Sequence, residues 1–67
     1  MTEQQRQLIL PLLLSLAQVR TMDQVNILWS AVEAALRTAG VNPGTKPTSV
    51  PQAKSVATSL RRRVLGA

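Results

Sequence analysis

The stretch LILPLLLSLA, residues 8–17, decides the fold, because eight of its ten residues are Leu, Ile or Ala and the exceptions are Pro11 and Ser15. Leucine and alanine are strong helix formers, so the stretch indicates a helix and not a strand. On a helical wheel the apolar residues cover an arc of roughly 240°, against the ~100° stripe of a typical surface helix. We expect the excess apolar surface to be buried between chains.

The size of the chain points in the same direction. A domain near this length buries only ~60% of the surface that its unfolded chain exposes. The 67 residues include no Cys and no His, which excludes disulfides and zinc sites of the ordinary type as a source of stability. We therefore expect one small helical domain that is completed by association into a dimer or a higher oligomer.

The composition predicts an all-α fold with an aliphatic core, because helix formers dominate and Trp29 is the only aromatic residue. We divide the chain into an apolar helical hairpin over residues 1–39, a linker over residues 40–50 and a basic helix over residues 51–67.

The first helix is expected over about residues 3–20, because Thr2 and Gln5 have the spacing of a capping box. Pro11 falls in the polar sector of the helical wheel, where water can satisfy the carbonyl group that it leaves without a donor. We favour one kinked helix through Pro11. The alternative is a short frayed turn followed by a helix with Pro11 in its first turn.

The second helix is expected over about residues 22–39. Thr21 and Gln24 form another capping box, and Gly40 suits the left-handed position that follows a helix. The linker then contains the sequence Asn-Pro-Gly-Thr at residues 42–45, which is typical of a type II turn.

The third helix is expected over about residues 51–65, with Ser49 as its cap and Pro51 in its first turn. It is the most regularly amphipathic of the three helices, because one modest apolar stripe faces Lys, Arg, Ser, Thr and Gln.

The apolar hairpin is predicted to carry the oligomer interface, because both of its helices are apolar on two sides. Small side chains on the second helix would let another helix approach closely. The predicted interface residues are Leu8, Leu10, Leu12, Leu14, Leu16, Ile27, Ala31 and Ala34.

The third helix is the candidate partner-binding element. Five of the eight basic residues lie from Lys46 onward and no acidic residue follows Glu33. Arginines interspersed with hydroxyl groups suit acidic side chains or phosphate oxygens. The plainer interpretation is a solvated helix end, where cations favour the helix dipole and keep an apolar protein soluble. The predicted contact residues are Lys54, Thr58, Arg61, Arg62 and Arg63.

Trp29 lies at the edge of the apolar stripe of the second helix, so it is either a core residue or an interface hot spot. Core burial is the favoured interpretation.

Catalysis is not expected, because the chain lacks His and Cys and its acids, Glu3, Asp23 and Glu33, do not form a pair on one helix face. The three glycines are scattered, so no phosphate loop is present. We expect no cofactor, no metal and no small-molecule substrate.

The apolar run of about a dozen residues is shorter than the ~20 that a spanning helix needs, and its N-terminal flank lacks the positive charge of a secretory signal. We expect a cytoplasmic protein without a membrane span.

Three hypotheses follow. The first is a non-enzymatic helical binding protein that self-associates through the hairpin and presents its basic helix to an acidic partner. The second is a nucleic-acid-associated protein that contacts phosphates through Lys54 and the cluster Arg61–Arg63. The third is a small structural subunit of a large assembly such as a capsid or molecular machine.

Overall fold

Three α-helices account for most of residues 1–66, which are the residues that the computed structural model describes. They are α1 (Glu3–Leu16), α2 (Met22–Thr38) and α3 (Val50–Gly66). The all-α class and the order hairpin, linker, helix are confirmed. Ala67, the last residue of the predicted basic segment, lies outside the described residues.

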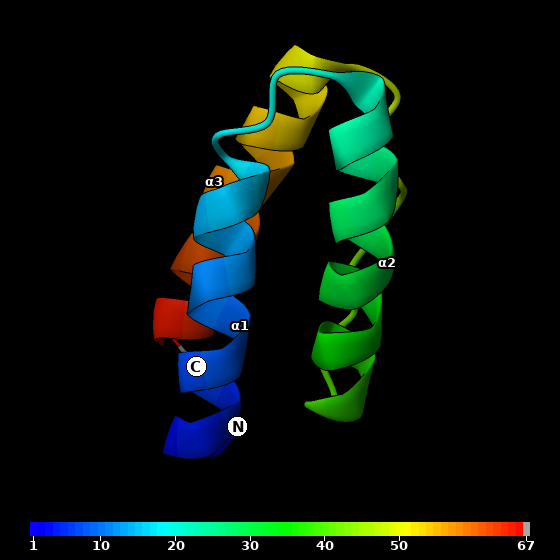
Figure 1. Cartoon of the computed structure of the whole chain (residues 1–67). Helices are drawn as coiled ribbons and strands as arrows, with labels where there is room; N and C mark the ends of the chain where they lie inside the picture. Colours follow the sequence, from blue (N-terminus) through cyan, green and yellow to red (C-terminus); the bar gives the residue numbers. More distant parts are fainter. Residues whose placement is uncertain (67) are drawn as a thin grey trace.

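The helices are arranged around α1. In Figure 1, α1 runs upward, α2 runs back down beside it, and the linker returns to the upper end, where α3 begins. Consequently α3 is antiparallel to α1, and its last turn lies at the same end of the bundle as the first turn of α1. Helix α1 packs against both other helices, whereas α2 and α3 have few contacts with each other.

The core lies between the three helices and explains how the leucine-rich stretch is covered. Residues Ile9, Leu13 and Leu16 of α1 are almost completely buried within one chain. The core is completed by Val19, Val25, Trp29, Val32, Leu36, Ala53, Ala57, Leu60 and Val64. These three residues of the stretch need no second chain for their burial, because α2 and α3 flank α1. Leu8 and Leu14 remain more than half exposed, and the burial of this excess surface between chains stays a prediction.

All three helices begin with the same pair of residue types. In each case a hydroxyl side chain at the N-cap accepts a hydrogen bond from the backbone N–H of a glutamine three residues later, at 3.1–3.3 Å. The pairs are Thr2 with Gln5, Thr21 with Gln24, and Ser49 with Gln52. Each pair satisfies one of the N–H groups that a helix start leaves free.

The glutamines complete these caps in two ways. The side chain of Gln5 accepts from the N–H of the cap residue itself, as a capping box requires. Gln24 accepts instead from the N–H of Arg20 at 2.7 Å, and Gln52 from the N–H of Thr48 at 2.8 Å. The predicted box at Thr21 is therefore corrected: its second bond reaches one residue further back.

Helix α1 ends at Leu16, four residues before its predicted end at Arg20. The N–H of Ala17 closes the last turn, and the chain then turns so that Val19 enters the core. An antiparallel helix pair needs a loop of a few residues, and Thr21 already caps α2, so the reversal must fall before it. The other predicted helix boundaries agree with the structure to within one residue.

Pro11 lies inside α1, and its side chain is exposed. The prediction of one helix through the proline is confirmed, and the alternative of a frayed turn with Pro11 in the first turn of a later helix is wrong. The polar position explains this outcome, because water can reach the carbonyl group of Gln7 that Pro11 cannot serve.

The linker begins with a tight helix stop. Gly40 has a φ of 77°, its N–H donates to the carbonyl oxygen of Arg37, and the N–H of Val41 donates to that of Leu36 at 2.8 Å. This is the Schellman arrangement, in which a residue in the left-handed conformation lets the chain satisfy the last helical carbonyl groups. The predicted stop at Gly40 is thus the observed one.

The rest of the linker is packed and not free. Pro43 and Pro47 are buried, and Gly44 has the positive φ, 78°, that a type II turn needs at this position. The N–H of Gly44 donates to the side-chain oxygen of Asn42 at 2.9 Å. The linker is therefore held against the bundle at its two buried prolines.

Candidate functional site

The predicted partner-binding residues of α3 do not form one surface. Lys54, Thr58 and Arg61 recur at spacings of four and three, so they form a single exposed ridge on the helix. Arg62 is also exposed but lies about 100° further round the helix. The adjacent residues Arg61 and Arg62 therefore point to different sides of α3.

Arg63 has a structural contact. Its Nη1 donates a hydrogen bond to the backbone carbonyl oxygen of Asn42 at 3.1 Å, a contact across 21 residues of sequence. This bond joins the guanidinium to the linker, while the Arg63 side chain remains exposed. The assignment of Arg63 to the partner-binding surface stays a prediction. The separation in sequence explains why no local pattern indicated the contact.

Thr58 also has a hydrogen bond within the protein. Its hydroxyl group donates to the backbone carbonyl oxygen of Lys54 at 3.1 Å, within the helix. The hydroxyl group is exposed and can also accept, so the role of Thr58 in partner binding stays a prediction.

Charges are distributed unevenly over the chain. Residues 1–39 contain three acidic residues and three arginines, so their formal charge is zero, and the remaining residues carry all of the net charge of +5. The two ion pairs found in residues 1–66 are Glu3–Arg6 at 3.1 Å and Glu33–Arg37 at 3.6 Å, both in the hairpin. None of the α3 cations belongs to either pair, so α3 presents positive charge to solvent.

An apolar groove runs between α1 and the ridge of α3. It has a volume of about 280 Å³ and is lined by Leu10, Pro11, Leu14, Arg61 and Leu65. Leu14 and Leu65 are 55% and 53% exposed, which is high for leucine. We call this groove, with its five lining residues, the α1–α3 groove.

Sequence reasoning did not identify Leu65 or Pro11 as members of a surface. The available signal was the helical spacing, because residues 54, 58, 61 and 65 recur at four, three and four and so continue the ridge.

Further exposed apolar side chains occur on α1 and α2. Leu8 is 64% exposed and Ile27 is 73% exposed, and Ala31 and Ala34 are exposed beside the latter on α2. We call these four residues the α1–α2 face.

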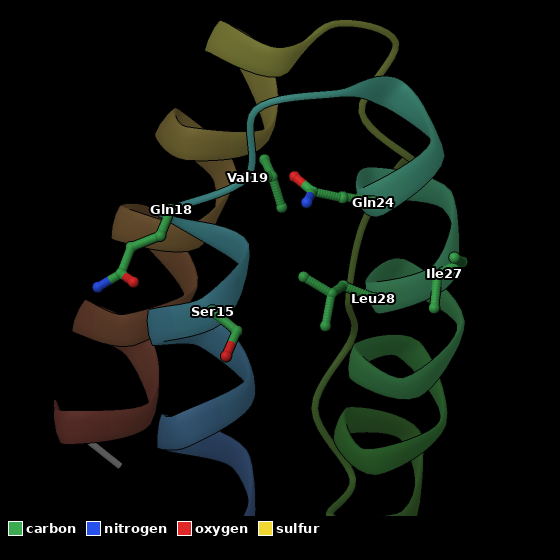
Figure 2. A pocket seen from close by; sticks show the side chains of 6 residues that line it. All are labelled: Ser15, Gln18, Val19, Gln24, Ile27 and Leu28. Atoms are coloured by element: carbon green, nitrogen blue, oxygen red, sulfur yellow. The ribbon is translucent and has the colours of Figure 1, made fainter.

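Two hollows lie along the junction of α1 and α2. One, of about 230 Å³, is lined by Gln5, Leu8, Ile9, Ala35 and Thr38. The other, of about 310 Å³, lies at the end where the hairpin turns, and is lined by Ser15, Gln18, Val19, Gln24, Ile27 and Leu28. In Figure 2, Leu28 extends from α2 toward α1, whereas Ile27 lies further out.

The predicted oligomer interface is thus divided by the structure. Leu16 is 0% exposed and belongs to the core, so its assignment to an interface is corrected. Leu10 and Leu12 are half-buried against the core, and Leu14 lies on the side of α3. The α1–α2 face retains the other four predicted residues. The sequence showed that α1 is apolar on several sides, but not which neighbour covers each side.

Trp29 lies in the core of the bundle and is 4% exposed. Its indole Nε1 has no hydrogen-bond partner among the described residues. A buried donor without a partner costs ~1–3 kcal/mol, so apolar packing of the ring must outweigh this loss. Its burial removes Trp29 from the candidate contact surfaces.

The described residues contain no group of His, Cys, Asp or Glu that could hold a metal ion. No helix in residues 1–66 is both long and apolar enough to cross a membrane.

Comparison with protein-family models, with curated proteins and with solved structures finds no match for the chain.

Proposed function

We propose that this chain is a small non-enzymatic binding protein that self-associates through the α1–α2 face and presents α3 to an acidic surface of a partner protein. The observation that carries the proposal is the exposure of Lys54, Arg61 and Arg62, none of which pairs with a carboxylate in the described chain. A group of exposed positive charges attracts anions and accelerates the encounter with them.

A protein partner is favoured over nucleic acid by the apolar residues that accompany the cations. Arg61 shares the α1–α3 groove with Leu14 and Leu65, both of which are more than half exposed. Phosphate groups give such leucines nothing to pack against, whereas a protein surface offers carboxylates and apolar side chains together.

Self-association is assigned to the α1–α2 face because of its charge. Two copies of a chain of net charge +5 repel each other least where the charge is balanced, and the hairpin has a formal charge of zero. Leu8 and Ile27 expose apolar surface there, and Ala31 and Ala34 allow close approach of a second copy.

The proposal is tested by removing cations in two places. The triple variant Lys54→Gln/Arg61→Gln/Arg62→Gln removes three charges from α3, and the control Arg20→Gln/Arg37→Gln/Lys46→Gln removes three exposed charges elsewhere. Binding of each variant to an acidic helical peptide and to duplex DNA is measured over a salt series. We expect the α3 variant to lose peptide binding and the control to retain most of it.

Equal losses in both variants would show that only net charge matters and would contradict the proposal. Duplex DNA that binds more tightly than the peptide, with a steep salt dependence, would favour phosphate contacts instead.

A further inference from the structure

The α1–α3 groove combines exposed apolar surface with one sign of charge. Leu10 and Leu14 line it from α1 and Leu65 from α3, with Arg61 beside them. No acidic residue occurs between Glu3 and Asp23 or after Glu33, so none of the five residues that line the groove has a carboxylate side chain. Lys54, two helical turns before Arg61 on the same ridge, continues the positive edge.

Pro11 gives this groove a second distinguishing property. It is exposed, lines the groove, and is part of neither a turn nor the buried core. A proline inside a helix is unfavourable for folding, and it leaves the carbonyl oxygen of Gln7 without its backbone donor. The fold thus retains Pro11, which is unfavourable for helix stability, at the groove, and the carbonyl oxygen of Gln7 that lacks its backbone donor lies one turn before it.

We propose that the α1–α3 groove binds an acidic amphipathic helix of a partner protein. The apolar side of that helix packs on Leu10, Leu14 and Leu65, and its carboxylates contact Arg61 and Lys54. Two antiparallel helices with an apolar groove between them suit a third helix laid along them. This inference rests on the proposed function and adds the form of the partner.

The ridge also sets the spacing of the partner's acids. Lys54 and Arg61 are seven residues apart in one helix, a rise of ~10.5 Å. A helix that lies along the groove meets both cations when its acidic residues recur every seven positions, with leucines between them on the same side.

The test uses the full chain and a synthetic 18-residue helical peptide of Leu, Ala and Glu with that spacing, labelled for fluorescence anisotropy. Two matched pairs of variants separate the groove from the rest of the surface. Leu14→Gln is compared with Leu8→Gln, because both leucines are more than half exposed on α1. Arg61→Gln is compared with Arg62→Gln, because the two arginines are adjacent and only Arg61 lines the groove. Circular dichroism establishes that each variant keeps its fold. Because Leu8 lies on the α1–α2 face, binding is measured at a chain concentration at which sedimentation shows the same association state for the wild type and every variant.

We expect Leu14→Gln to weaken peptide binding by about tenfold, as the loss of one buried leucine contact implies, and Leu8→Gln by less than about twofold. Arg61→Gln should weaken binding several times more than Arg62→Gln. A peptide with Gln in place of Glu should bind weakly to the wild type and lose the difference between Arg61→Gln and Arg62→Gln.

The outcomes distinguish this inference from the proposed function. If binding depends on the α3 cations but both matched pairs behave alike, the groove inference is overturned and the proposed function stands. If the triple α3 variant binds the peptide as the wild type does, both are overturned. Binding to vesicles of anionic lipid in place of the peptide would overturn the assignment to a protein helix.

Discussion

Arg63 fastens the last turn of α3 to the start of the linker, because its guanidinium donates to the backbone carbonyl oxygen of Asn42 at 3.1 Å. The neighbouring Arg62 has no such contact among the described residues. Both side chains are exposed, but only Arg63 bonds to another part of the chain, in a run of three arginines that the sequence presents as equivalent.

We expect Arg63→Gln to lower the free energy of unfolding by ~0.5–1.5 kcal/mol, the usual contribution of one hydrogen bond. Arg62→Gln should change it by less than ~0.5 kcal/mol, as is common for exposed positions. Urea denaturation followed by circular dichroism measures both values. A larger effect at Arg62 would contradict the assignment.

Pro11→Ala should raise the free energy of unfolding by ~1–3 kcal/mol, because the helix penalty of proline is lifted and the N–H to Gln7 is restored. The position is exposed, so the smaller side chain leaves no cavity. The same variant should bind the acidic peptide less tightly if the shape of the α1–α3 groove depends on the proline. Loss of several kcal/mol of stability would mean that packing of the bundle requires Pro11.

Gly40→Ala should destabilise the fold by ~1–2 kcal/mol, because an L-residue is strained at its φ of 77°. The control is Gly66→Ala, which has no positive φ and open space around the added methyl group. Thermal unfolding of both variants measures the difference. Equal melting temperatures would show that the Schellman stop of α2 contributes little.

Association is tested at the α1–α2 face. Sedimentation of the wild type at micromolar concentration should show a dimer or a higher oligomer. Leu8→Glu/Ile27→Glu should give helical monomers, since both side chains are exposed and their replacement creates no cavity. Leu12→Glu/Leu16→Glu should instead unfold the chain, because Leu16 is buried in the core. A wild type that remains monomeric at every concentration would exclude self-association.

The positions of the helices could be predicted because their starts are encoded locally. Thr2, Thr21 and Ser49 each have a glutamine three residues later, and Gly40 ends α2 by its own conformational freedom. The end of α1 could not be predicted in this way. It is set by the reversal of the hairpin and by the burial of Val19, which are tertiary effects.

The surfaces could be predicted only in part, for a similar reason. Helical periodicity shows which residues share a face, so the ridge of Lys54, Thr58 and Arg61 was accessible from the sequence. It does not show which helix lies against that face. Leu14 lines a groove beside α3, whereas Leu8 lines a hollow beside α2, and Arg63 donates a hydrogen bond to Asn42. These arrangements depend on how α2, α3 and the linker pack around α1.

The small number of contacts between α2 and α3 also affects which helix unfolds locally first. Helix α3 contributes two alanines, Ala53 and Ala57, among its four buried core residues, whereas α2 contributes Trp29, Val25, Val32 and Leu36. Docking of α3 therefore buries less apolar side-chain area, and α3 is held mainly by α1 and the linker. Its amide hydrogens should exchange with solvent earlier than those of the hairpin, as one cooperative unit. The basic helix is thus also the part of the fold whose local stability a bound partner would raise most.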